Sequence, residues 1–149
     1  MENCPFFKLL NIENVKDIVY LQQKNQFIDG WSKEMLNDGF NKGGLKCLGA
    51  YLKEEELVAF ITYSVCGIDA EIQDLLVDRS FRKKGIATKL IKNLFENLLG
   101  QKVQNVFLEV RENNVNAINL YIKNGFTQIT IRKKYYSNGE NALVMKKTL

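Results

Sequence analysis

The 149-residue chain alternates between two hydrophobic periods, and each change of period marks a predicted element. Apolar residues recur in pairs every three or four positions from Ile86 to Leu99, which predicts an amphipathic helix that ends at Gly100. Weaker helical spacing predicts a helix over residues 14–25 and one of two to three turns that ends at Asn124. Ser32 can cap a further short helix through Leu36, before the glycines from Gly39 onward break the pattern.

Runs rich in β-branched and aromatic residues predict strands between these helices. The runs cover residues 6–10, 46–53, 57–65, 70–78, 103–110, 126–134 and 142–147. Short polar connections predict that the second and third runs form one hairpin and the last two another. With the helices in their places, this order predicts an α/β fold: one domain, residues 1–149, with a mixed sheet and helices on its faces.

Composition excludes several kinds of catalytic site. The chain has no histidine, which removes Ser-His-Asp and Cys-His catalysis and every histidine-ligated metal site. Cys4, Cys47 and Cys66 lie far apart and form no C-x-x-C pair, so we expect free thiols in a reducing compartment and no metal. No apolar run approaches the ~20 residues that cross a bilayer, and the first residues lack a signal-peptide pattern. We therefore expect a cytoplasmic protein with no membrane partner.

The net charge of +4 leaves two interpretations open. It can serve solubility alone, or it can favour an anionic ligand or a position near nucleic acid. The basic and aromatic residues 132–136 resemble a short nucleic-acid patch, but a solvated strand end explains them as well, and we expect no direct nucleic-acid contact.

A basic turn between a strand and the long helix is the strongest candidate for ligand binding. The apolar residues Leu75, Leu76 and Val77 lead through Asp78 into Arg82-Lys83-Lys84-Gly85, and helical spacing begins at Ile86. The first N–H groups of a helix have no partner inside it and carry the positive end of its dipole, and a glycine lets an anion approach them closely. The chain contains neither G-x-G-x-x-G nor G-x-x-x-x-G-K-[ST], so this turn is not a Rossmann or Walker loop. An ordinary solvated turn remains the alternative.

Two residues downstream have side chains suited to proton transfer. Glu109 lies near the end of an otherwise apolar strand, where burial would raise its pKa toward that of a useful base; alternatively it pairs with Arg111 or a lysine. Tyr121, in the next helix, is either a half-buried core aromatic or a phenol that protonates a leaving thiolate. Ligands of α/β sheets bind beyond the carboxyl ends of parallel strands, so both residues are expected near a ligand held by the basic turn.

The pattern Arg82-x-x-Gly85-x-Ala87 after a strand resembles the Q/R-x-x-G-x-G/A signature of the GCN5-related N-acetyltransferase (GNAT) family. The segments LLVD, WSKEM, FLEVRENNVNAINLYIKNGF and the IRKKYYSNGENALVM ending extend the resemblance over nearly the whole chain. The C-terminal half resembles in particular the bacterial members that acetylate an N-terminal alanine of a small-subunit ribosomal protein. The family fold implies a mostly antiparallel central sheet of about seven strands with helices on both faces. Ala87 departs from the more common glycine, a change that the family tolerates.

The resemblance implies a role for each matching residue. Glu109 becomes the general base, through water, and Tyr121 the general acid on the coenzyme A thiolate. The residues implied to bind acetyl-coenzyme A (acetyl-CoA) are Leu75, Leu76, Val77, Arg82, Lys83, Lys84, Gly85, Ile86, Ala87, Thr88 and Asn114. Trp31 and Tyr135 are expected to line the acceptor groove, or simply to pack against loops.

Acetyl transfer to a protein α-amine by direct attack in a ternary complex is therefore the expected activity, with a small-subunit ribosomal protein as the acceptor. Two alternatives remain open at this point. The acceptor can be a small-molecule amine or a lysine side chain, or the chain can be a non-catalytic module that binds coenzyme A or RNA.

Overall fold

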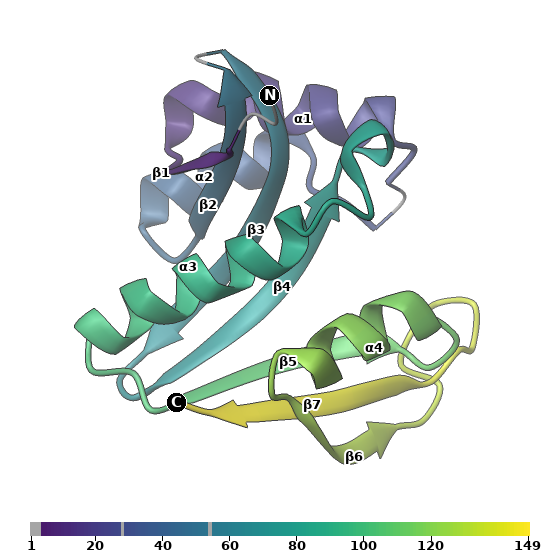
Figure 1. Cartoon of the computed structure of the whole chain (residues 1–149). Coiled ribbons are helices and arrows are strands. Elements are labelled where there is room, and N and C mark those ends of the chain that lie inside the picture. Colours follow the sequence, from purple (N-terminus) through teal and green to yellow (C-terminus); the bar gives the residue numbers. More distant parts are fainter. Residues whose placement is uncertain (1–3, 28, 54) are drawn as a thin grey trace.

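The computed structural model describes residues 4–27, 29–53 and 55–149, and within them the chain forms a seven-stranded sheet of order β1-β2-β3-β4-β5-β7-β6 (Figure 1). The strands are β1 (Phe6–Leu9), β2 (Lys46–Lys53), β3 (Glu56–Cys66), β4 (Asp69–Val77), β5 (Asn105–Arg111), β6 (Thr127–Arg132) and β7 (Ala142–Thr148). The helices are α1 (Val15–Lys24), α2 (Lys33–Lys42), α3 (Ile86–Gly100) and α4 (Val115–Lys123), with short 3-10 turns η1 (Ile12–Asn14) and η2 (Arg79–Phe81). The expected α/β fold and order of elements are confirmed.

Helices cover both faces of the sheet, as Figure 1 shows, and each face has its own core. On one face, α3 buries Ile86, Leu90, Ile91, Leu94 and Leu98 against the strands, and Tyr121 of α4 joins the same cluster. On the other face, α1 and α2 cover a second cluster, which includes Leu36, Phe60 and Leu76. Alternate residues of one strand therefore contribute to different cores.

The parallel pair β4–β5 positions the site. Within the described residues, every other neighbouring pair in the sheet is antiparallel. The register pairs Asp69–Ile72 only with Asn105–Leu108, and beyond that point the two strands diverge (Figure 1). The carboxyl-terminal half of β4 therefore keeps β3 on one side and faces an opening on the other.

Several predicted boundaries differ from the observed ones. Helix α2 runs through Gly39 to Lys42, because the missing side chain of Gly39 lets Leu45 pack there; an added Cβ would lie 2.8 Å from Leu45 Cβ. Leu99, which the spacing assigned to the apolar face of α3, is 55% exposed. Asp78 lies outside β4, where its carboxylate accepts from the Ser80 N–H and starts the η2 turn.

None of the helices in the described part of the chain is both long and apolar enough to span a bilayer.

Candidate active site

A cleft of about 480 Å³ opens where β4 and β5 diverge. Its walls come from the segment between α1 and α2, from β4 and β5, from α4, and from the loop between β6 and β7. The lining residues include Asp29, Glu71, Asp74, Leu75, Glu109, Arg111, Asn114, Tyr121, Tyr135 and Tyr136. Sequence segments far apart in the chain therefore meet in one concave site, the default place for a ligand.

The basic turn, residues 82–85, is the part of the site best suited to bind an anion. Gly85 precedes the first residue of helix α3 and has a left-handed φ of 79°, and no side chain of the described residues caps the first N–H groups of the helix. Lys83 has a left-handed φ of 62°, so the two residues curl the turn around the helix start. Residues 82–85 are exposed, and space beside Gly85 is open. Uncapped N–H groups, a helix dipole and three cations together make an anion-binding end.

Contacts to α1 hold the beginning of the turn in place. Lys24 Nζ lies 2.7 Å from Asp78 Oδ2, and Asn25 Oδ1 accepts from the Arg79 N–H at 2.8 Å. Burial acts to raise the pKa of Asp78, but the Lys24 ammonium and the Ser80 N–H together keep it below its ordinary value. Arg82 Nε donates to the Val77 carbonyl at 3.0 Å, which joins the turn to the end of β4.

Tyr121 reaches the cleft from α4 while its ring packs in the core. The ring is 7% exposed and meets Phe126 edge-on at 5.6 Å. Burial first, and then the negative charge of Asp74, raise the pKa of the Tyr121 phenol. The hydroxyl is therefore protonated at neutral pH, where it can act as a proton donor.

Glu109 projects from β5 on the face opposite the buried Leu108 and Val110. The expected alternation is confirmed, and Glu109 is ion-paired as the alternative expected, but its partner is neither Arg111 nor a lysine: Glu109 Oε1 lies 3.1 Å from Arg132 Nε of β6. The Tyr135 hydroxyl also approaches this carboxylate, which raises the pKa of the Tyr135 phenol. Two neighbours on the β6–β7 side thus orient the Glu109 carboxylate.

Arg111 lies two residues after Glu109, at the end of β5, and connects the two sides of the cleft. Its guanidinium binds Asp29 with three contacts of 2.9–3.1 Å and Glu140 with one of 3.0 Å. The Tyr136 ring lies 3.8 Å from the guanidinium carbon. Because the planar guanidinium is bound on two edges and stacked on one face, it fixes the segment after α1 against the β6–β7 loop.

Comparison with known proteins decides the family. The model of the Acetyltransferase (GNAT) family matches residues 12–126. The chain belongs to the GNAT family. It is an N-acetyltransferase with acetyl-CoA as its acetyl donor, and the expected fold and family are confirmed.

Individual relatives extend this similarity. The ribosomal protein bS18-alanine N-acetyltransferase of Haemophilus ducreyi is 37% identical over 120 residues, which cover 77% of this chain and 81% of the relative. The crystal structure of the ribosomal-protein-S18-alanine N-acetyltransferase from Escherichia coli has a TM-score of 0.86 at 23% identity, over 97% of this chain and 94% of that one. The PaiA N-acetyltransferase from Thermoplasma acidophilum, in complex with coenzyme A, has a TM-score of 0.78 at 18% identity, over 98% of this chain and 99% of that one.

Substitution of Gly85 in the basic turn directly tests anion binding there. If the turn binds the pyrophosphate of acetyl-CoA, Gly85→Ala should raise the KM for acetyl-CoA about tenfold, because a methyl group beside the anion would weaken a charge-assisted hydrogen bond. Steady-state kinetics with varied acetyl-CoA measure this change.

Gly43→Ala is a matched control for that variant. Gly43 has a φ of 76° and open space around it, as Gly85 has, but it lies at the end of α2. Both variants should lose about 1–2 kcal/mol of stability through left-handed strain. An equal rise of the KM in both would contradict a pyrophosphate site at Gly85.

Asn114 and Trp31 occupy different positions in the enzyme. Asn114 lines the cleft, and its side-chain oxygen caps α4 by accepting from the Ala117 N–H at 3.2 Å. Trp31 instead lines a neighbouring depression beside α1, where the Gln22 side chain holds both its main-chain N–H and its carbonyl. Its indole Nε1 is buried and makes no hydrogen bond of good geometry to any described group, but it lies near enough to Asp74 to lower the pKa of that carboxyl.

Asp74 is a residue of the site that the sequence analysis missed. It lines the cleft, and burial raises its pKa to about 7, while the nearby Trp31 indole lowers it and Asp29 adds to the rise. The sequence offers no comparable signal for Asp74, because β4 also contains Asp69 and Glu71, whereas Glu109 is the one carboxylate of β5.

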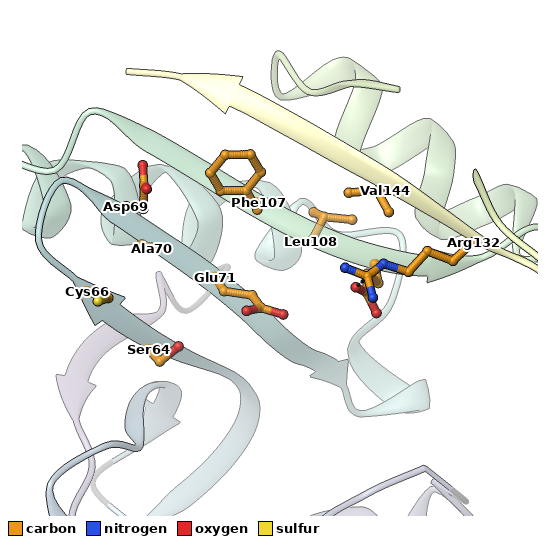
Figure 2. Close-up of a pocket in the computed structure, with 10 residues that line it drawn as sticks. Ser64, Cys66, Asp69, Ala70, Glu71, Phe107, Leu108, Arg132 and Val144 are labelled. Carbon is orange, nitrogen blue, oxygen red and sulfur yellow. Dashed lines mark ion pairs between the residues drawn. The ribbon is translucent and has the colours of Figure 1, made fainter. Parts of the chain in front are cut away.

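A second hollow, of about 280 Å³, adjoins the cleft on the face of the sheet that α3 does not cover. It shares Glu71 and Glu109 with the cleft. Figure 2 shows Glu71 on β4 and Arg132 on the far side, with side chains that point toward each other across the hollow. Carboxylates therefore line both the cleft and the hollow beside it.

Proposed function

We propose that this enzyme transfers the acetyl group of acetyl-CoA to the N-terminal α-amine of a protein, with the alanine N-terminus of ribosomal protein bS18 as acceptor. The observation that carries the proposal is the meeting of Glu109 and Tyr121 in one cleft, beside the open edge of β4 that leads to the basic turn. The relatives named for bS18-alanine acetylation support the acceptor, since the Haemophilus ducreyi protein is similar over 77% of this chain.

The donor is placed along β4 in this proposal. Leu75, Leu76 and Val77 offer main-chain groups to the pantetheine arm on the edge that β5 leaves open. Residues 82–88 hold the pyrophosphate, and Asn114 contacts the cofactor from the start of α4. The thioester then lies near Tyr121, at the point where β4 and β5 separate.

The chemistry needs one proton acceptor and one proton donor. The amine attacks the thioester carbonyl, the carbon–sulfur bond breaks, and the nitrogen loses a proton to Glu109 through water. Tyr121 gives its proton to the departing thiolate, so coenzyme A leaves as a thiol. An α-amine has a pKa of about 7.7–8 and is partly neutral at pH 7, whereas a lysine, at about 10.4, would demand a stronger base.

Trp31 and Tyr135 have different prospects as acceptor-binding residues. Tyr135 is 49% exposed and lines the cleft, so we propose that it contacts the acceptor. We propose that Trp31, which lines the neighbouring depression, does not contact the acceptor and acts only on Asp74, whose pKa its indole lowers. We further propose that residues 1–149 form a single catalytic domain and that the enzyme works in the cytoplasm, where free cysteines such as the exposed Cys66 persist.

The choice of acceptor amine can be tested with two peptides. We expect acetyl-CoA and enzyme to add one acetyl group to a peptide that begins with the alanine of bS18 and contains an internal lysine. The same peptide with a blocked N-terminus should remain unmodified, because its only amine is the lysine. Mass spectrometry of intact and fragmented peptides locates the group. Equal modification of the blocked peptide would show a lysine acceptor and contradict the proposal.

A further inference from the structure

Asp74 faces the cleft only because β4 contains a β-bulge. Along β4, Ala70 and Ile72 lie in the core beneath α3, and strict alternation would place Asp74 there too. The register instead pairs Thr62 with Asp74 and Tyr63 with Ile72, so Gln73 is an extra residue. From Asp74 onward, the even-numbered residues of β4 therefore face α1 and α2 instead of α3, and Leu76 lies in the core beneath α1 and α2. The buried Thr62 hydroxyl accepts from the Asp74 N–H at 3.0 Å and stabilises the bulge.

Charged and titratable groups surround Asp74 on several sides. Asp29 and Trp31 lie on the segment between α1 and α2, Cys47 on β2 and Tyr121 on α4. On β4 and β5, Glu71, Glu109 and Arg111 line the same cleft. The negative charge of Asp29 helps to raise the pKa of Asp74, and a charge on Asp74 in turn helps to raise the pKa of the Cys47 thiol and the Tyr121 phenol.

Asp74 has no cationic partner among the described side chains, although the cleft wall contains two guanidinium groups. Arg111 is bound by Asp29 and Glu140, and Arg132 by Glu109. Asp74 is thus a carboxyl group that lines the cleft with no described cation to balance its charge, and although the Trp31 indole lowers its pKa, burial outweighs that effect. A desolvated carboxylate of this kind gains much from a cation that enters the cleft.

We propose that Asp74 receives the acceptor's α-ammonium group and holds it between Glu109 and Tyr121 before the proton is removed. This makes Asp74 a substrate-binding residue of the reaction, and the inference rests on the proposed function. At neutral pH most of a free α-amine is protonated, so the form that Asp74 binds is the abundant one. Glu109, already paired with Arg132, is left to accept the proton through water.

Asp74→Asn tests the role of the charge, because it keeps the shape of the side chain and leaves the main-chain contact to Thr62 in place. We expect the KM for an alanine-first peptide to rise about 10- to 100-fold through loss of a charge-assisted hydrogen bond. The KM for acetyl-CoA should stay unchanged. Asp69→Asn is the control: it makes the same change on the same strand, and the hydrogen bond that Asp69 accepts from Asn105 can persist. It should alter neither constant.

The pH profile gives a readout that a merely structural role would not change. For the wild type, kcat/KM for the peptide should rise as Asp74 ionises near pH 7 and fall above pH 8, as the free amine loses its charge. In Asp74→Asn, the bell-shaped profile should be replaced by a kcat/KM that rises with pH as the neutral fraction of the amine increases.

Thermal unfolding shows whether the variant is folded. Because the pKa of Asp74 is raised in the folded state, its stabilising contribution is present at low pH and is lost as the pH rises through about 7. Asp74→Asn should therefore melt no lower than the wild type at pH 8. If it does melt lower, Asp74→Ser serves as the second variant for the same measurements.

The outcomes separate the two proposals. A wild type that acetylates no peptide α-amine overturns the proposed function and this inference with it. A wild type that acetylates the peptide, beside an Asp74→Asn enzyme with unchanged acceptor KM and an unchanged bell, overturns the inference alone.

Discussion

Tyr121→Phe is expected to lower kcat by about 100- to 1,000-fold while acetyl-CoA still binds. The phenol is the proposed donor to the coenzyme A thiolate, and burial keeps its pKa raised, so the proton is present throughout the neutral range. Phenylalanine preserves the ring and its edge-on contact with Phe126, so the fold should persist. Single-turnover kinetics and calorimetric binding of acetyl-CoA measure the two effects separately.

Tyr63→Phe is the matched control for that loss. Tyr63 is 2% exposed and belongs to the same core cluster, and its phenol pKa is also raised by burial, but it does not line the cleft. Removing its hydroxyl should leave kcat near the wild-type value. A Tyr121→Phe enzyme with wild-type kcat would rule out Tyr121 as the proton donor.

Glu109→Gln is expected to lower kcat/KM for the peptide by about 100-fold at pH 7, because the proton acceptor is lost. A glutamine oxygen can still accept from Arg132, so the local arrangement should survive. The deficit should shrink at pH 9, where the α-amine is already neutral and less base is needed. Initial rates of both enzymes over this pH range check the prediction.

Glu71→Gln shows whether negative charge alone explains the effect of Glu109. Glu71 is exposed on the neighbouring strand, borders the same cleft and hollow, and loses the same charge in the variant. We expect only a small change, as for other exposed substitutions. A deficit equal to that of Glu109→Gln, and equally dependent on pH, would assign the effect to the charge of the acceptor side and not to a specific base.

Three groups in different surroundings handle the protons of the proposed reaction: Tyr121 donates one, Glu109 accepts one, and Asp74 binds the ammonium. Tyr121 is buried and protonated, Glu109 is paired with Arg132, and Asp74 is uncompensated. Groups whose surroundings differ in this way can bind, accept and donate protons in one cleft at one pH. Neither histidine nor a metal is needed for this division, because a thioester is already activated toward an amine.

Local patterns in the sequence were sufficient for the fold, the family and the position of the turn between β4 and α3. The helical pairs from Ile86 to Leu98 and the strand runs report which face of each element is buried, and burial is what periodicity measures. The turn at Gly85 could be predicted because its function depends on neighbouring residues: a strand end, a glycine and a helix start. The same applies to the alternation that directs Glu109 away from the core.

Only the tertiary structure could decide which groups meet across the cleft. Arg132, not Arg111, pairs with Glu109, because the order β5-β7-β6 brings β6 within reach, and no spacing in the sequence reports this. Trp31 lines a depression beside the cleft and not the cleft itself, with its main chain held by Gln22. Asp74 faces the cleft because the extra residue Gln73 exchanges the faces of β4, and a bulge depends on register with the partner strand. The sequence by itself therefore determined the fold, the family and the turn before α3, and it singled out Glu109 and Tyr121 as candidates, whereas the arrangement of groups around the cleft depends on contacts between strands.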